Sequence, residues 1–288
     1  MMKSSIDLAA NYDLAFLAEL VADLRAAAPN WEPLVVGAMA RDLLLHYTHK
    51  IPVGRATEDI DLAFAVADWE NFNALRTAML LSALFEPHKS LAHRLSHRQR
   101  YWVDLIPFGG LERQDGSIAW PPRGEQVMTV IGYREALASA INIMLPQGQR
   151  VLVVSLPMLA VLKVFAWSER HLVAPRKDAA DLVLIIKSYL DAGQHDRLYD
   201  DAPHLLEHND FDYERAGAWL AGRDAARTID TFGSDPTNLH QLISTIVTRE
   251  VDPEGPLRLV GEVGGPEAEN VRCLLAAFLS GFNGEQTP

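Results

Sequence analysis

The 288-residue sequence predicts an α+β protein, in which a mixed sheet with helices is followed by a helical second half. Short apolar and β-branched runs alternate with helical patterns between Tyr12 and Val154, whereas only helical patterns follow Ser155. Hydrophobic residues make up 49% and charged residues 22% of the chain, which is ordinary for a globular protein with a substantial core. We therefore expect two domains, at residues 1–154 and 155–288.

The first half carries the expected strands and the helices that alternate with them. In chain order they are a helix over Tyr12–Ala28 ended by Pro29, a strand over Leu34–Val36, a helix over Ala38–His46, a strand over Asp59–Val66, a helix from its N-cap Asp68 to Leu84, a strand over Tyr101–Gly109, a hairpin turn at Asp115-Gly116, a helix over Tyr133–Ala140, and a β-hairpin of Ile141–Leu145 and Arg150–Val154. Strands interleaved with helices in this way indicate an α/β layer.

The second half is expected to be helical throughout. The first of its predicted helices is capped by Ser155 and carries Lys163, Trp167 and Arg170. The others are predicted over Lys177–Leu190, Pro203–His208, Tyr213–Ile229, Asn238–Arg249 and Glu267–Ser280. The last hundred or so residues carry no motif that points to a chemistry.

The composition excludes several classes of protein. A net charge of −12 argues against broad sequence-independent binding to nucleic acid, which needs a basic surface. The single cysteine, Cys273, rules out an intrachain disulfide and a zinc cluster of cysteines, and fits a reducing compartment. The first residues form no apolar signal core, and no apolar run approaches the roughly 20 residues that span a bilayer. We expect a soluble cytoplasmic protein with no membrane partner.

Two carboxylates stand out at the start of one predicted strand. Side chains alternate along a strand, so Asp59 and Asp61 point the same way while Ile60 and Leu62 enter the core. Carboxylates crowded on one face repel each other unless a cation lies between them, and Mg²⁺ or Mn²⁺ takes oxygen ligands of this kind. The alternative is an exposed strand end that happens to carry two acids.

Two further features favour a site over that alternative. Asp104 interrupts an apolar strand, where a lone acid is costly unless it is paired or bound to metal. Gly37 forms a turn between a strand and a helix, a place where backbone N–H groups can face a phosphate. With Asp59 and Asp61 they predict a seat for a metal–triphosphate.

Histidines and arginines crowd the segment between residues 88 and 100. They could hold a triphosphate or an RNA acceptor, or they could belong to a solvated hairpin. Because the segment directly precedes Asp104, we expect His93 and Arg94 to lie near the acids. The histidines show no spacing typical of a zinc site.

These motifs together resemble a known family. Gly37-Ala38 followed by Asp59-Ile60-Asp61 is similar to the pattern of the nucleotidyltransferase superfamily, whose fold is polymerase-β-like, and Asp104 resembles its third carboxylate. Gly37 to Asp42 and Arg55 to Asp61 resemble AbiEii-type toxin and abortive-infection nucleotidyltransferases, and also echo tRNA nucleotidyltransferases and poly(A) polymerases. One departure is Ala38, where the family usually has Gly or Ser, so that only the backbone could bind phosphate there.

The resemblance extends into the second half. Lys163 and Arg170, followed by Asp178 and Asp181, are similar to a Lys–Arg helix and an Asp-x-x-Asp helix of AbiEii-type chains. The resemblance implies that Lys163 binds nucleotide phosphates and that Asp178 or Asp181 is a further catalytic or positioning acid. The alternative is a salt bridge between these helices.

Other residues have implied roles near the nucleotide. They are Gly37, Ala38 and Arg41 at the phosphate seat, Arg55 and Thr57 ahead of the acid pair, and Arg170 in the second half. For Arg41 the alternative is a salt bridge with a nearby acid such as Glu58.

The implied reaction moves a nucleoside monophosphate from an NTP to a hydroxyl. Asp59, Asp61 and Asp104 would hold two Mg²⁺ or Mn²⁺ ions, one activating the hydroxyl and one neutralising the departing pyrophosphate. The resemblance implies tRNA or a protein as acceptor, although a small molecule stays open, and it implies a cognate antitoxin as a partner. The rival interpretation is a non-catalytic nucleotide-binding or regulatory protein that retains the fold, which Ala38 favours.

Overall fold

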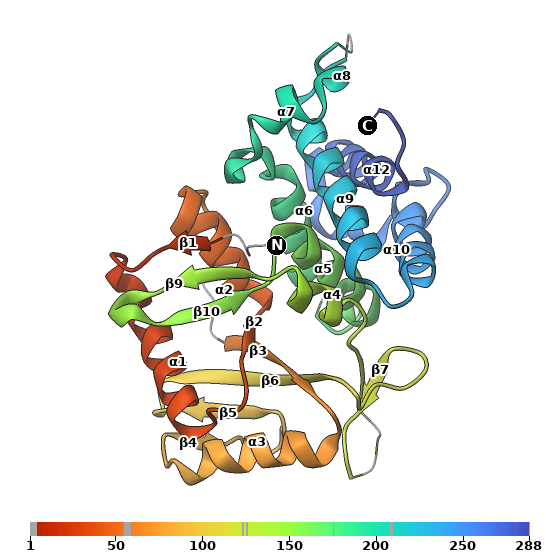
Figure 1. Ribbon diagram of the computed structural model, residues 1–288. Helices are drawn as coiled ribbons and strands as arrows, with labels where there is room; N and C mark the ends of the chain where they lie inside the picture. The colour runs from red at the N-terminus through yellow and green to blue at the C-terminus, as the bar shows by residue number, and fades with distance from the viewer. Residues whose placement is uncertain are drawn as a thin grey trace. The chain divides into compact units, whose positions relative to one another are not determined.

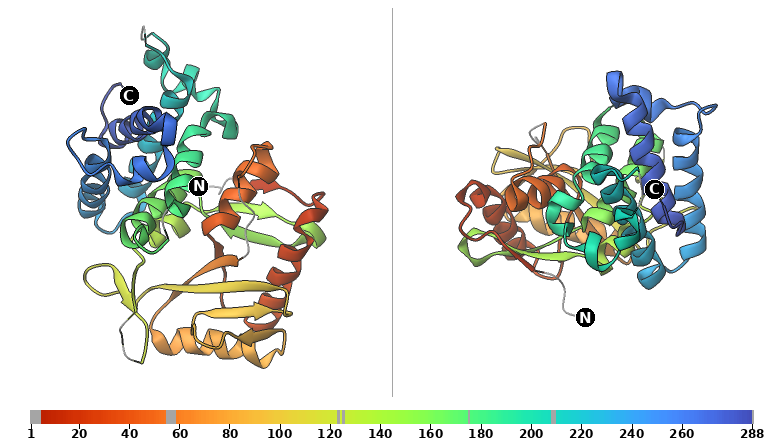
Figure 2. Two further views of the ribbon diagram at one scale, coloured as in Figure 1. Left: turned by 180° about the vertical axis from the view of Figure 1, so that it is seen from behind. Right: turned by 90° about the horizontal axis from the view of Figure 1, so that it is seen from above.

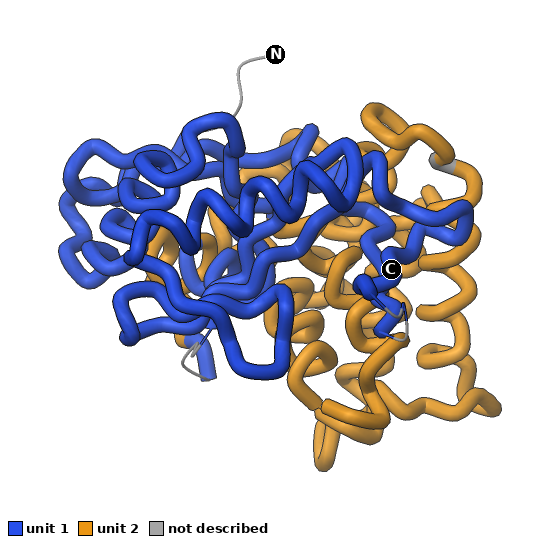
Figure 3. Tube along the Cα trace, turned by 90° about the horizontal axis from the view of Figure 1, so that it is seen from below, with its two compact units in different colours: residues 1–43, 53–155 blue, residues 44–52, 156–288 orange. Residues whose placement is uncertain are grey.

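The computed structural model describes residues 5–54, 59–122, 124, 126–174, 176–207 and 210–287. The chain divides into two compact units, which Figure 3 shows in different colours. Unit 1 comprises Met1–Leu43 and Val53–Ser155, and unit 2 comprises Leu44–Pro52 and Leu156–Pro288. Among the described residues, the strands all belong to the first unit, whereas the second unit is built from helices.

The core of unit 1 is a mixed sheet of eight strands (Figure 1). In spatial order they are β1 (Ser5–Asp7), β9 (Ile141–Met144), β10 (Arg150–Val153), β2 (Leu34–Val35), β3 (Asp59–Val66), β6 (Tyr101–Gly109), β5 (Arg94–His97) and β4 (Phe85–Pro87). The pairs β1–β9, β10–β2 and β3–β6 are parallel, and the other neighbours are antiparallel. A separate ribbon pairs β7 (Ser117–Ala119) with β8 (Val127–Thr129).

Helices of unit 1 pack beside this sheet (Figures 1 and 2). They are η1 (Tyr12–Leu14), α1 (Ala15–Ala27), α2 (Gly37–Arg41), α3 (Trp69–Leu81), α4 (Tyr133–Ala138) and the short turn η3 (Pro146–Gly148), while η2 (Asp42–Tyr47) runs on from α2 into unit 2. The α3 helix begins where Asp68 accepts a hydrogen bond from the Asn71 amide, at 2.8 Å, so the predicted N-cap is present. Leu17, Leu24 and Leu75 are fully buried in this packing.

Unit 2 is a bundle of helices. Its elements are α5 (Leu156–Arg170), α6 (Lys177–Lys187), η4 (Leu190–Gln194), α7 (Arg197–Asp200), α8 (Pro203–Leu206), α9 (Tyr213–Phe232), α10 (Pro236–Val251), α11 (Arg258–Val263), η5 (Gly265–Glu267) and α12 (Ala268–Asn283). Two glycines set the spacing of α9 and α12, because a Cβ on Gly222 would lie 2.0 Å from the Phe278 carbonyl and one on Gly281 would lie 2.0 Å from the Trp219 carbonyl. The two backbones therefore meet at a distance that only glycine permits.

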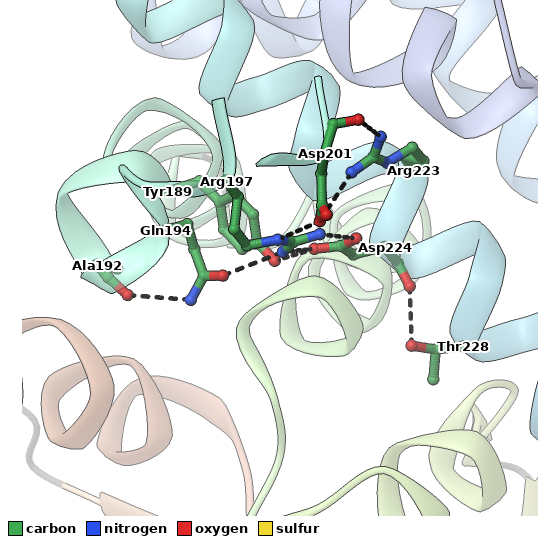
Figure 4. A network of polar contacts seen from close by, with 8 residues as sticks. All are labelled: Tyr189, Ala192, Gln194, Arg197, Asp201, Arg223, Asp224 and Thr228. Atoms are coloured by element: carbon green, nitrogen blue, oxygen red, sulfur yellow. Dashed lines mark hydrogen bonds and ion pairs between the residues drawn. The ribbon is translucent and has the colours of Figure 1, made fainter. Parts of the chain in front are cut away.

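A polar network fastens the segment after α6 onto α9 (Figure 4). Asp224 accepts hydrogen bonds from Tyr189 at 2.5 Å and from both terminal nitrogens of Arg197, one of them at 2.8 Å. Arg197 also donates to Asp201 at 2.8 Å. Burial, with Asp224 close by, raises the pKa of Tyr189 well above its usual value, so this phenol stays protonated and serves as a structural donor.

The structure confirms the α+β prediction, with a mixed sheet and many helices. The predicted helix over Ala38–His46 changes type within its length, because α2 ends at Arg41 and continues as the π-helical η2. The Asp115-Gly116 turn forms, and Asp115 accepts hydrogen bonds there from the amide and hydroxyl of Ser117. It leads into β7, which pairs with the later strand β8, so among the described residues this turn does not join two paired strands. Within the described ranges, no helix is long and apolar enough to cross a bilayer.

Candidate active site

The three predicted acids of unit 1 lie on two neighbouring strands. Asp61 on β3 is the register partner of Asp104 on β6, and Asp59 is the partner of Trp102. Residues two apart on a strand share a face, so all four side chains belong to one face of the sheet. The sequence could not show this register, because it depends on the parallel pairing of β3 with β6.

Arg94 on β5 lies between two of these acids. Its Nε and Nη2 atoms donate to the two carboxylate oxygens of Asp104, each at 2.6 Å, and Nη2 also donates to Asp59 Oδ2 at 3.0 Å. Hydrogen bonds to Asp104 raise the pKa of Arg94 further above its usual value, so the guanidinium stays charged. We refer to Asp59, Asp61, Asp104 and Arg94 as the carboxylate cluster.

Gly37 is fitted closely against this cluster. Its φ of +64° lies in the left-handed region, and a Cβ built on it would lie 2.0 Å from Asp61 Oδ2. Any other residue would displace the Asp61 carboxylate as well as strain the backbone. The glycine turn and the acid strand are therefore built against each other, and α2 begins at this glycine with Ala38 as its next residue.

Aromatic rings lie beside Arg94 and beside its chain neighbour His93. Trp102 is 39% exposed, and the guanidinium carbon of Arg94 lies 6.0 Å from the centre of its ring. The His93 ring lies 5.0 Å from that of Trp120, and burial lowers the pKa of His93, which favours the neutral imidazole. Sequence reasoning did not single out Trp102, although its position two residues before Asp104 on one strand was a usable signal.

The donor chemistry of the cluster fits a divalent cation. Asp59 and Asp104 already converge on one cation, the Arg94 guanidinium, through oxygens of the kind that Mg²⁺ and Mn²⁺ bind. Among the residues that the structure describes, no three or more His, Cys, Asp or Glu side chains gather as a metal site. Arg94 thus lies between two of the three acids that the sequence predicts as metal ligands.

A second charged cluster joins α5 to α6 in unit 2, and we call Lys163, Arg170, Asp178 and Asp181 the helix-pair cluster. Lys163 Nζ donates to Asp178 Oδ1 at 2.9 Å and to Asp181 Oδ2 at 2.6 Å. Arg170 donates to both oxygens of Asp178, at 2.7 and 3.0 Å. The salt bridge between helices, which the sequence left open as an alternative, is therefore present.

Burial distinguishes this cluster. The side chains of Lys163, Asp178 and Asp181 are 5%, 1% and 4% exposed, whereas that of Arg170 is half exposed. Burial by itself raises the pKa of Asp178, but the nearby charges of Lys163 and Arg170 and their hydrogen bonds bring it below its usual value. Asp178 is accordingly an ionised partner of Lys163.

The remaining predicted contacts have mixed outcomes. Arg41 is 2% exposed and donates through Nε to Asp42 Oδ1 at 2.8 Å, so one acid that it pairs with is its own neighbour. Ala38 is buried at the second position of α2. Arg55, Thr57 and Glu58 lie outside the described residues.

The mixed sheet, with its glycine turn opening a helix beside an acid strand, has the features of a nucleotidyltransferase. A family model described as the nucleotidyl transferase AbiEii toxin of a Type IV toxin–antitoxin system matches residues 34–230, more than half of the chain. The chain therefore belongs to the AbiEii nucleotidyltransferase family, and nucleotidyl transfer is its class of reaction.

Two further comparisons do not add to this assignment. Among solved structures, that of the antibiotic-resistance factor ANT(2'')-Ia matches with 18% identity and a TM-score of 0.38, over 67% of this chain and 99% of that chain. This likeness is too distant to inform the site. A search of curated proteins found no match.

Proposed function

We propose that this protein transfers a nucleoside monophosphate from an NTP to a hydroxyl group, with Asp59, Asp61 and Asp104 holding Mg²⁺ or Mn²⁺. The observation that carries the proposal is the fit of Gly37 against Asp61, with Asp104 in register on the next strand. This fit supports a site in which the glycine turn would face a phosphate and the neighbouring carboxylates would hold a metal. Both are needed to bring a triphosphate and its cation together.

The bound metal would supply charge neutralisation at the triphosphate and a lowered pKa for the acceptor hydroxyl. The residues of the chain would do the positioning, which accounts for most of the catalysis in phosphoryl-type transfer. The N–H groups at the start of α2 would face a phosphate, and Asp104 would orient the acceptor hydroxyl. Lys163, Arg170, Asp178 and Asp181 would contribute to nucleotide binding as positioning residues.

We propose tRNA or a protein as the acceptor and a cognate antitoxin as the partner. The support is membership of a toxin family of Type IV toxin–antitoxin systems. The net charge of −12 favours an acceptor that is contacted over a small area, such as one RNA end or one protein side chain, over a long nucleic acid. Arg41, Arg55 and Thr57 would lie on the nucleotide side of such a site.

The test is transfer of label from each of the four NTPs to total cellular RNA and protein in the presence of Mg²⁺. The wild type is compared with the double variant Asp59→Ala/Asp61→Ala. Label in one fraction, lost in the variant, would establish the reaction and identify the acceptor class. Nucleotide binding with no label in either fraction would instead support a non-catalytic nucleotide-binding protein.

A further inference from the structure

The carboxylate cluster contains a competitor for the metal it is proposed to bind. Arg94 engages both oxygens of Asp104 and one oxygen of Asp59, three of the four carboxylate oxygens of these two residues. A divalent cation takes carboxylate oxygens at about 2.0–2.6 Å, and it would bring a second positive charge to a carboxylate whose two oxygens already accept from the Arg94 guanidinium. The two cations therefore compete for Asp104.

We propose that Arg94 is a displaceable counter-cation of this site. A divalent cation and the guanidinium compete for Asp59 and Asp104, and the released Arg94 binds a phosphate of the nucleotide that arrives with the metal. The proposal rests on the proposed function in taking a nucleotide as the ligand. The competition between Arg94 and a divalent cation can be tested with the protein and Mn²⁺ alone, without a nucleotide.

The surroundings of Arg94 suit a side chain that exchanges partners. The side chains of Arg94, Asp59 and Asp104 are 24%, 23% and 13% exposed, so water can take part in the exchange. The Trp102 ring, with its centre 6.0 Å from the guanidinium carbon, offers a further contact through cation–π attraction. A planar guanidinium also suits a phosphate as well as it suits a carboxylate, because it can donate two parallel hydrogen bonds to either.

The first experiment is calorimetric titration of the full-length protein with Mn²⁺, without nucleotide. Arg94→Ala removes the competing cation, and we expect Mn²⁺ to bind about tenfold more tightly than to the wild type, as loss of one charge-assisted bond implies. Arg98→Ala is the matched control, since Arg98 follows the same strand but pairs with Asp23 on α1. The control should leave the Mn²⁺ affinity unchanged, and Asp104→Ala should weaken it.

Arg94→Lys is a second, more conservative variant, which keeps the proposal testable if Arg94→Ala does not fold. It keeps the charge but loses the bidentate pair with Asp104, so its Mn²⁺ affinity should lie between those of the wild type and Arg94→Ala. Affinities for both variants that equal or fall below the wild-type value would overturn the proposal, because Arg94 would then merely hold the acids in place. The same conclusion would follow from Mn²⁺ binding that is insensitive to Asp104→Ala.

The second experiment measures binding of a non-hydrolysable NTP at saturating Mn²⁺. If the released guanidinium binds phosphate, Arg94→Ala should weaken NTP binding about tenfold while it strengthens binding of Mn²⁺ alone. This opposite pair of effects is specific, because a structural role for Arg94 would weaken both. Unchanged NTP binding by Arg94→Ala would overturn the claim that the released guanidinium binds a phosphate. A rise in the Mn²⁺ affinity of Arg94→Ala, together with no label transfer by the wild type, would support competition between Arg94 and the metal while the proposed function failed.

Discussion

The two charged clusters share one plan, a cation between two aspartates, but differ in burial. Lys163 is held by Asp178 and Asp181 with side chains 5% exposed or less. Arg94 is held by Asp59 and Asp104 with side chains up to 24% exposed. A buried ion pair is costly to break, about 3–5 kcal/mol, whereas exposed pairs contribute about 0–1 kcal/mol. The same pairing of a cation with two aspartates thus gives a stable salt bridge between two helices in unit 2 and an ion pair that can exchange its cation in unit 1.

The strands and helices that carry the clusters explain the difference. The carboxylate cluster lies at neighbouring positions of β3, β5 and β6, on a sheet face that leaves Trp102 partly exposed. The helix-pair cluster lies between α5 and α6, which pack against each other and on which Leu159 and Leu182 are also fully buried. Four predictions test the contrast, beginning with the largest expected effect.

Asp104→Asn should separate activity from stability. We expect label transfer to fall about 1,000-fold, because a metal ligand and a group that orients the acceptor are both lost. The free energy of unfolding should fall by only about 1 kcal/mol, since the amide still accepts a hydrogen bond from Arg94. Transfer assays and urea unfolding measure the two effects. A large loss of stability with normal transfer would reverse the roles assigned to the two clusters.

Asp178→Ala should mainly destabilise the protein. It removes one carboxylate that the buried Lys163 donates to, and we expect the free energy of unfolding to fall by about 3–5 kcal/mol in urea. The control is Arg170→Ala, whose half-exposed side chain should cost about 1 kcal/mol or less. Equal effects of the two substitutions would show that burial does not govern this cluster.

Gly37→Ala should affect the site through a single methyl group. The left-handed backbone costs about 1–2 kcal/mol for alanine, and the new Cβ must displace the Asp61 carboxylate. Gly148→Ala is the matched control, because Gly148 has φ of +71° but nothing within 4 Å of its Cβ position. Gly148→Ala should lose stability in urea through the backbone alone and keep transfer, whereas Gly37→Ala should lose at least as much stability and also lose transfer. Equal transfer by both would contradict the close fit at Asp61.

The smallest effect concerns pH. The pKa of Asp178 is below its ordinary value of 3.8, so ionised Asp178 stabilises the folded state above that pH. This stabilisation should be lost as the pH falls from 3.8 through the lower folded-state pKa. Asp178→Asn cannot titrate, so its deficit in free energy of unfolding should be constant at higher pH and shrink in that acid range. A deficit independent of pH would show that Asp178 is not an ionised partner of Lys163.

Much of the site was readable from residue order. Alternation along a strand placed Asp59 and Asp61 on one face, and an acid within an apolar strand marked Asp104, because these are local consequences of backbone geometry. Gly37 was readable as a turn for the same reason. The helix pair was also predicted with its charged residues, since positions three and four apart share a helix face.

The interaction partners of those residues could not be predicted from the sequence. The pairing of Arg94 with Asp104 and Asp59 depends on which strand lies beside β6, and the sequence left open a solvated hairpin at that segment. The choice between phosphate binding and an interhelical salt bridge at Lys163 depended on how α5 packs on α6. The close approach of Gly37 to Asp61 likewise arises between a turn and a strand more than twenty residues away.

The sequence by itself therefore determined the α+β class, the acids, the glycine turn and the family resemblance, because each is written in local periodicity or a short motif. Only the tertiary structure decided that Asp59 and Asp104 meet Arg94, that Asp178 and Asp181 meet Lys163, and how exposed to water each of these ion pairs is. Coulombic energy depends on the distance between charges and on their burial, and both are set by strand register and helix packing between segments that are distant in the chain.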